Sequence, residues 1–123
     1  MGKWIRDRIR SFGYAFEGIA ELFRNTQNAR VHAVVTIAVI AAGIWLRPTA
    51  VEWCLLALCI GGVLAAEAVN SAIESLADKV SPEKHPLIKK SKDLAAGAVL
   101  LMTFAAVAVG LIIFLPLLLG KIS

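Results

Sequence analysis

The stretch Glu67–Asp93, EAVNSAIESLADKVSPEKHPLIKKSKD, lies between two apolar runs that have the character of membrane spans. Its first half carries four polar side chains at a spacing of three or four: Glu67, Asn70, Glu74 and Asp78. At about 100° per residue, these four side chains fall within an arc of about 80° on one helix face. The spacing therefore predicts an acidic stripe, a name we use for these four residues.

The two glutamates of the acidic stripe are predicted to lie at different depths. The uncharged, mostly apolar residues Trp53–Ala66 precede Glu67 without a break. At about 1.5 Å per residue, Glu67 lies about 21 Å along the helix from Trp53, inside a hydrocarbon core of about 30 Å, and Glu74 lies about 10 Å further. A carboxylate inside a span is a functional-site hypothesis, because hydrocarbon solvates charge poorly. The alternative is that the stripe, above all Glu74 and Asp78, is a solvated face at a helix end.

The composition indicates a membrane protein. The chain has 123 residues, of which 59% are hydrophobic, and a mean hydropathy of +0.75. These values are too apolar for an ordinary soluble domain. We expect a single all-α integral membrane domain, in which so small a chain needs neighbouring subunits to bury a polar site. Its expected parts are a surface helix at about 3–24 and spans at about 29–47, 51–80 and 91–119.

The charge distribution predicts a topology. The formal net charge is +4, and basic residues gather in Met1–Arg30 and Lys79–Lys92, whereas the connection between the first two spans offers only Arg47 against Glu52. By the positive-inside rule, the N-terminus and the second connection are cytoplasmic. Because topology accounts for the basic excess, we expect no nucleic-acid partner.

The N-terminal segment has the pattern of an amphipathic helix in the membrane interface. The alternative is a soluble helix packed on a partner. Asn25–Asn28 interrupts this pattern, and Val31–Leu46 follows as the first span, about 24 Å long. His32, near the cytoplasmic end of that span, is expected to be a hydrogen-bonded interfacial histidine and not a ligand. The apolar positions of the amphipathic pattern are Ile5, Ile9, Phe12, Phe16, Ile19 and Phe23.

The second half of the opening stretch, Ser81–Asp93, has the composition of a basic loop, with two prolines, a histidine and four lysines. Such a loop commonly marks topology or contacts anionic lipid. Here it also faces the acidic stripe across a short turn. Lysines opposite carboxylates suit a nucleotide phosphate with its magnesium. The uncharged segment Leu94–Leu119 is expected to be scaffold or lipid-facing wall.

Two linked motifs resemble those of the small prokaryotic lipid kinases, diacylglycerol kinase and its undecaprenol kinase relatives. The first is ExxNxxxExxxD, from Glu67 to Asp78, and the second is ExHxLxxxxKD, from Glu83 to Asp93, followed by AAGAVLL. The resemblance extends to GYAFEGI around Tyr14, to NARVH and to the order of three spans. It therefore covers nearly the whole chain.

The resemblance implies a homotrimer in the bacterial inner membrane that uses ATP and magnesium to phosphorylate a membrane lipid alcohol. By motif, Glu67 is implied to be the general base, with Asn70 as its positioning partner, and Glu74 is implied to bind the metal. Lys92 is implied to lie near the phosphates. The full implied nucleotide site consists of Tyr14, Glu74, Glu83, His85, Lys92 and Asp93.

The chain departs from the family pattern at Thr26, where many members carry a second metal-binding glutamate. A threonine coordinates only through a neutral oxygen, so either metal binding is weaker or another group substitutes, with Glu21 as a candidate. Undecaprenol is favoured over diacylglycerol as the substrate, because SPEKHPLIKKSKDLAAGAVLL is closer to the undecaprenol kinase branch. The rival from another class is a small transporter with Glu67 as a proton site. A transporter function would explain Glu67, but it would not explain why Glu74, His85 and Lys92 occur together.

Overall fold

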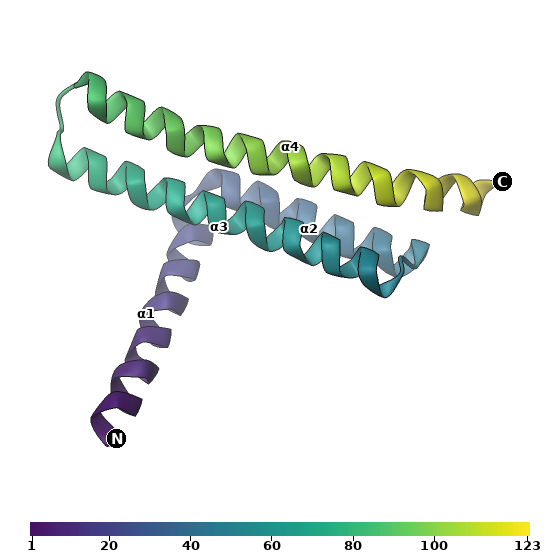
Figure 1. Cartoon of the computed structure of the whole chain (residues 1–123), viewed down its shortest axis with the longest axis horizontal. Helices are drawn as coiled ribbons and strands as arrows, with labels where there is room; N and C mark the ends of the chain where they lie inside the picture. The colour runs from purple at the N-terminus through teal and green to yellow at the C-terminus, as the bar shows by residue number, and fades with distance from the viewer.

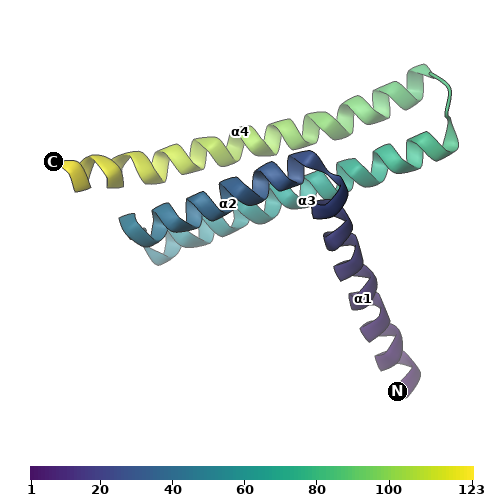
Figure 2. The same ribbon diagram turned by 180° about the vertical axis from the view of Figure 1, so that it is seen from behind.

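Four helices and no strand make up the computed structural model, which describes all residues from Met1 to Ser123. Helices α2, α3 and α4 run side by side, and α1 projects away from them (Figure 1). The view from behind shows the same arrangement (Figure 2). Because α2, α3 and α4 are each long and apolar enough to cross a membrane, the predicted fold class is confirmed. The bounds are α1 Gly2–Asn25, α2 Gln27–Leu46, α3 Ala50–Val80 and α4 Pro86–Ile122.

A single residue separates α1 from α2. Thr26 is extended, with φ −117° and ψ 111°, and its backbone N–H still donates to the Leu22 carbonyl at 3.1 Å. The interruption predicted over Asn25–Asn28 is thus confined to Thr26, because helical hydrogen bonding resumes at once when the Arg30 N–H donates to the Thr26 carbonyl at 3.3 Å. Helix α2 therefore has 20 residues, about 30 Å, and is longer than the predicted span.

The turn between α2 and α3 is held by local contacts. Arg47 takes the left-handed conformation, with φ 58°, and its N–H donates to the Gly43 carbonyl at 2.8 Å. Thr49 and Glu52 form a reciprocal capping box that starts α3. The Trp53 ring packs directly on Gly43, where any side chain would collide with it. These contacts set the C-terminal end of α2 against the N-terminal end of α3.

The connection between α3 and α4 is shorter than the predicted loop Ser81–Asp93, because α4 already begins at Pro86. His85 supplies the N-cap, as its Nδ1 accepts from the Leu87 backbone N–H at 3.1 Å. Proline is favoured at the first helical position, since its fixed φ suits a helix and its missing N–H is not needed there. The prediction of a loop through Asp93 was therefore wrong, and Lys92 and Asp93 have a fixed helical orientation.

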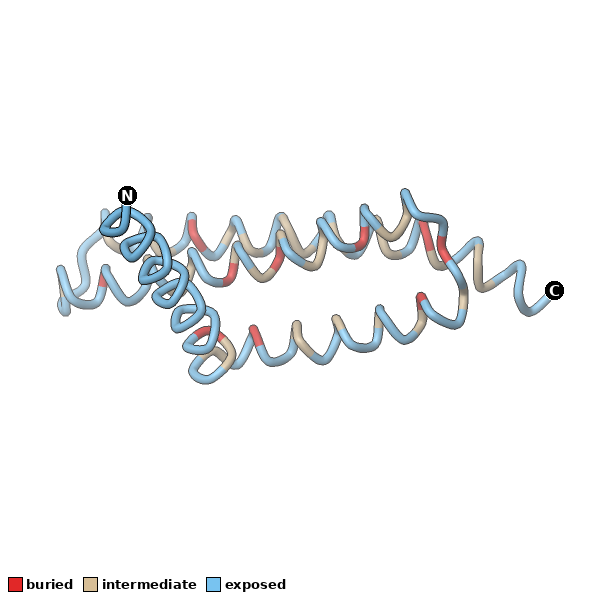
Figure 3. The backbone as a smooth tube through the Cα atoms, turned by 90° about the horizontal axis from the view of Figure 1, so that it is seen from below, coloured by how far each residue is buried: buried red, intermediate tan, exposed pale blue.

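Few side chains are enclosed by the chain itself. Only 10 of 123 residues are buried, and they lie mainly where α2, α3 and α4 face one another, whereas almost all of α1 is exposed (Figure 3). The exposed surface of the three long helices is rich in large apolar side chains. Such a surface suits lipid or the helices of other subunits. The one large side chain that is fully buried is Glu67.

Candidate active site

Glu67 lies on α3 opposite α2 and is 1% exposed. The Nε2 atom of His32 is 3.3 Å from its Oε1 atom, and the His32 side chain is 22% exposed. The sequence predicts a hydrogen-bonded interfacial histidine at this position, but it does not identify Glu67 as the partner of His32. Counted along the chain, His32 and Glu67 lie at similar distances from the turn between α2 and α3. In two antiparallel helices, such residues are level with each other, and this spacing is the signal that could have identified the pair.

Asn70 follows Glu67 by one helical turn on the same face of α3. Its Oδ1 atom is buried and has no hydrogen-bond partner within the protein. Buried polar atoms are nearly always paired, so an unpaired acceptor calls for an explanation. An unpaired amide oxygen one helical turn from Glu67 can accept a hydrogen bond from a donor that the chain does not itself supply.

A groove of about 520 Å³ runs between α1 and α3, and we call it the α1–α3 groove. The exposed Glu74 lines it from α3, and Glu21 lines it from α1. The structure thus brings together Glu74 and the residue considered as a substitute for the missing family glutamate. The other polar residues lining the groove are Asn25, Thr26, Ser71 and Ser75.

Two hydrogen bonds order the polar side of the α1–α3 groove. The Asn25 Nδ2 atom donates to Glu21 Oε1 at 2.5 Å. The hydroxyl groups of Thr26 and Ser71 are 3.4 Å apart. Thr26 is therefore tied to α3 through a contact between two neutral hydroxyl groups.

The donor set of the α1–α3 groove fits a magnesium ion that arrives with a nucleotide. It contains two carboxylates together with amide and hydroxyl oxygens, and no three or more His, Cys, Asp or Glu side chains gather as a metal cluster anywhere in the chain. Proteins usually hold Mg²⁺ through one or two carboxylates plus substrate phosphates and water. A dedicated site built only from protein ligands is not present.

A second pocket, of about 630 Å³, lies at the connection between α3 and α4, and we call it the connection pocket. Four residues predicted for the nucleotide site line it together: Glu83, His85, Lys92 and Asp93. Asp78, to which the sequence assigned no role of its own, also lines it, and its Oδ1 accepts from Lys92 Nζ at 2.5 Å. The predicted facing of lysines and acidic stripe is confirmed by this contact.

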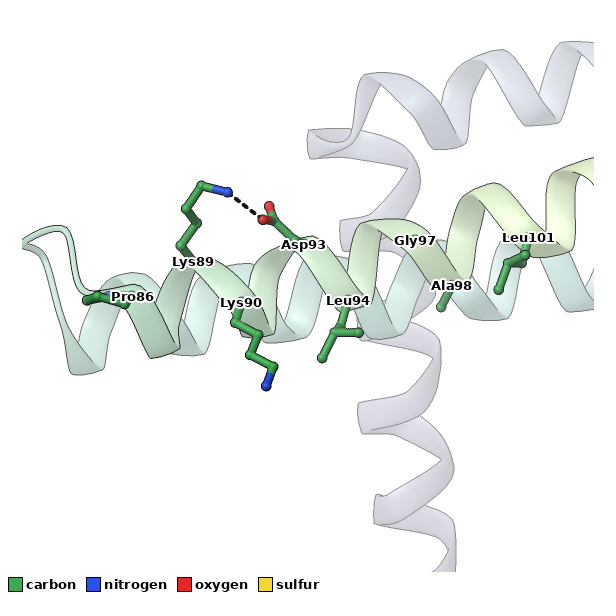
Figure 4. Close-up of a pocket in the computed structure, with 8 residues that line it drawn as sticks. All are labelled: Pro86, Lys89, Lys90, Asp93, Leu94, Gly97, Ala98 and Leu101. Atoms are coloured by element: carbon green, nitrogen blue, oxygen red, sulfur yellow. Dashed lines mark hydrogen bonds and ion pairs between the residues drawn. The ribbon is translucent and has the colours of Figure 1, made fainter.

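Asp93 and Lys92 have different ion-pair partners. The Oδ2 atom of Asp93 accepts from Lys89 Nζ at 2.6 Å, and Figure 4 shows the Lys89 side chain arching along the surface of α4 to reach it. The hollow drawn there, of about 520 Å³, follows α4 alone, and Lys90 points away from the pair. An exposed pair of this kind adds little stability. Lys89 is therefore available to an anion that enters the connection pocket, which it also lines.

Tyr14 is the predicted site residue that the structure does not bring to the others. It lies on the projecting helix α1, is 63% exposed, and lines neither the α1–α3 groove nor the connection pocket. Within one chain, the predicted residues therefore form three groups. Glu67 and Asn70 lie inside the bundle, Glu74 lies in the α1–α3 groove, and the remaining four residues lie in the connection pocket.

Comparison with known proteins identifies the family. Residues 13–114 match the sequence profile of prokaryotic diacylglycerol kinase. The chain is 39% identical over 108 residues to the undecaprenol kinase of Bacillus subtilis, covering 88% of each chain. It is 43% identical over 111 residues to a diacylglycerol kinase of Synechocystis, covering 89% of this chain and 63% of that relative.

A more distant relative is the diacylglycerol kinase of Escherichia coli, which is 30% identical over 99 residues, or 80% of this chain and 81% of the relative. The matched region contains α2, α3 and most of α4, and it includes every candidate site residue described above. This chain therefore belongs to the prokaryotic diacylglycerol kinase family, and it is a multi-pass membrane protein that acts as a lipid kinase.

Proposed function

We propose that this protein transfers the γ-phosphoryl group of ATP, in the presence of Mg²⁺, to the hydroxyl group of undecaprenol. The observation that carries the proposal is the contrast along one face of α3. Glu67 is buried inside the apolar helix bundle, whereas Glu74, two turns further, is exposed in a groove lined by oxygen atoms. A carboxylate at lipid depth can meet a lipid hydroxyl, and an exposed carboxylate can meet a nucleotide dissolved in water.

In the proposed reaction, Glu67 accepts the proton of the lipid hydroxyl as its oxygen attacks the γ-phosphorus. The bond between that phosphorus and the ADP oxygen breaks, so the products are the lipid phosphate, ADP and a protonated Glu67. Asn70 orients the hydroxyl oxygen or the Glu67 carboxylate through its Nδ2–H donors. Its buried Oδ1 remains free to accept a hydrogen bond from a group that the substrates bring. The enzyme thus provides positioning and electrostatic stabilisation, on which phosphoryl transfer depends.

The nucleotide is proposed to lie across the α1–α3 groove and the connection pocket. Glu74 would hold the magnesium ion, with Glu21 as the candidate for a second carboxylate ligand, and the ion would neutralise phosphate charge when it is bound. Lys92 would exchange its contact with Asp78 for the phosphates, and Glu83, His85 and Asp93 would bind the rest of the nucleotide. His85 also caps α4, so it sets the direction in which Lys92 projects.

The proposed assembly is a homotrimer in the bacterial inner membrane, with the N-terminus and the α3–α4 connection in the cytoplasm. The sparse burial within one chain supports an oligomer, because most of the long helices is left uncovered. Tyr14 supports it as well. Because α1 projects away from its own bundle, Tyr14 would join a nucleotide site by reaching across a subunit boundary.

Undecaprenol is proposed over diacylglycerol on two grounds. The segment from Ser81 to Leu101 is closer to the undecaprenol kinase branch, and the Bacillus subtilis relative that bears this name aligns over most of both chains. Diacylglycerol is the second candidate. The Synechocystis relative named for it has the higher identity, although the alignment spans a smaller share of that protein.

The test is transfer of radiolabel from γ-labelled ATP to extracted lipid by the purified protein with Mg²⁺. Undecaprenol and diacylglycerol are offered separately and then in competition. We expect label in both lipid fractions, with the larger kcat/KM for undecaprenol. The same assay is run on Glu67→Gln, which lacks the proposed base. Glu52→Gln is its matched control, because Glu52 lies in the first turn of the same helix, where it forms part of the capping box. A larger kcat/KM for diacylglycerol would overturn the substrate assignment, and no transfer to either lipid would overturn the proposed reaction.

A further inference from the structure

The Glu67 carboxylate is almost completely shielded from solvent by other residues of the same chain. Its side chain is 2% exposed, and His32 is the one charged or titratable group that contacts it. The His32 side chain is itself mostly enclosed. A buried carboxylate that must act as a base needs a partner that stabilises its ionised form, because burial disfavours charge.

We infer that His32 is a positioning residue for Glu67, an inference that rests on the proposed function. Its Nε2–H group holds Oε1 of the carboxylate, and this leaves Oε2 to accept the proton of the lipid hydroxyl. The neutral tautomer with hydrogen on Nε2 and the protonated ring both provide this donor. The role therefore does not depend on whether His32 is charged.

The 3.3 Å separation between Nε2 and Oε1 is long for a hydrogen bond. Hydrogen bonds that operate in catalysis are often long or poorly aligned before substrate binds, and they shorten in the reactive complex. A carboxylate held through one oxygen cannot turn freely about its last bond. Its second oxygen is then presented in one direction, which is what a proton acceptor for an incoming hydroxyl requires.

No other charged or titratable side chain contacts Glu67. His32 lies at one end of a cavity of about 320 Å³ between α2, α3 and α4, most of whose lining is apolar. The only other titratable side chain lining it is Cys59 from α3, and the residues that α4 contributes are uncharged. From α1, the nearest acidic group, Glu21, faces the α1–α3 groove. The low polarity of the cavity beside His32 strengthens the contact that His32 makes with Glu67.

Two amide substitutions test the role. In His32→Gln the side-chain Nε2 can still donate to Oε1, whereas the His32→Asn side chain is one methylene shorter and does not reach. We expect kcat in His32→Asn to fall about 10- to 100-fold, as a small misplacement of a reacting group can cost roughly 100-fold. The KM values for ATP and lipid should stay near wild type, and His32→Gln should recover most of kcat.

Thr36→Val is the matched control for a general disturbance of the cavity. Thr36 lines the same cavity one turn from His32, and its hydroxyl donates to the His32 carbonyl at 2.7 Å. We expect its kcat to stay within a few-fold of wild type. If Thr36→Val is as slow as His32→Asn, the cavity and not the Nε2 contact governs the rate, and the inference is overturned.

The remaining outcomes separate this inference from the proposed function. Wild-type transfer with equal kcat in His32→Asn and His32→Gln overturns the positioning role and leaves the kinase reaction intact. A rise in KM at constant kcat also overturns it, because it would show a role in binding. Absence of transfer in the wild-type protein itself overturns the proposed function, and the positioning role falls with it.

Discussion

The two halves of the acidic stripe have the same chemistry in different surroundings. Glu67 is 1% exposed, whereas the Asp78 side chain, three turns further along α3, is 68% exposed. Helix α2 covers the first half through His32. The C-terminal part of α3 then extends past Gln27, the residue at which α2 begins. The second half then faces α1 at Glu74 and α4 at Asp78. Carboxylates on one helix face can therefore serve different steps, because their neighbours and depth differ.

Glu67→Gln is the strongest test of the buried half. The amide has the same shape but cannot accept the hydroxyl proton, so we expect phosphoryl transfer to fall about 10²- to 10⁴-fold. Membrane insertion and oligomeric state should be unchanged. The rate of label transfer to lipid is the measurement, with Glu52→Gln as the control. A rate within a few-fold of wild type would remove Glu67 from the role of base.

Glu74→Gln tests the exposed half and should behave differently. We expect a loss of roughly 10- to 100-fold at low magnesium, since even partners that only orient metal ligands contribute that much. Unlike the loss in Glu67→Gln, it should be partly reversed at high magnesium, because mass action can compensate for a weaker site. Magnesium titrations of both variants at fixed ATP decide this. Equal insensitivity to magnesium would mean that Glu74 is not a metal ligand.

Mixing inactive subunits tests whether the two halves work across a boundary. Glu67→Gln lacks the proposed base, and Lys92→Gln lacks the proposed phosphate contact. If the site is shared between subunits, mixed oligomers will regain part of the wild-type rate, because some sites will combine two intact residues. The measurement is activity after co-expression, compared with each variant alone. No regained activity would indicate that each site is built from one chain.

Thr26→Glu should produce the smallest change, and in the favourable direction. The new carboxylate would face Glu74 across the α1–α3 groove, and Mg²⁺ prefers anionic oxygen ligands. We expect a few-fold lower magnesium concentration at half-maximal rate, with little change in the KM for lipid.

The control for this variant is Thr26→Gln, which has similar length and no charge. Glu21 already lines the α1–α3 groove, and if it fills the metal position, a third carboxylate will repel the other two. An unchanged or weakened magnesium dependence in Thr26→Glu would mean that Glu21 already supplies the second carboxylate, or that the side chain at position 26 does not face the metal.

Much of the architecture was predictable from hydropathy and spacing. Apolar runs of sufficient length predict helices, because a membrane leaves no other way to satisfy the backbone of a single spanning segment. The spacing of Glu67, Asn70 and Glu74 likewise predicts one helix face. The prediction of a loop before Leu94 failed because the signal for the start of α4 is short and local. His85 is the N-cap and Pro86 occupies the first helical position, within a polar composition that resembles a loop.

The sequence by itself determined the number of membrane helices, the acidic stripe and the family, because these depend on periodicity and motif spacing within short segments. Only the tertiary structure decided that His32 meets Glu67, that Glu21 joins Glu74 in one groove, and that Lys92 reaches Asp78. Each of these contacts joins two helices. Which residues meet depends on how the turns at Thr26, Arg47 and Ser81–His85 orient one helix against the next. The residue pattern of a single helix does not contain that geometry.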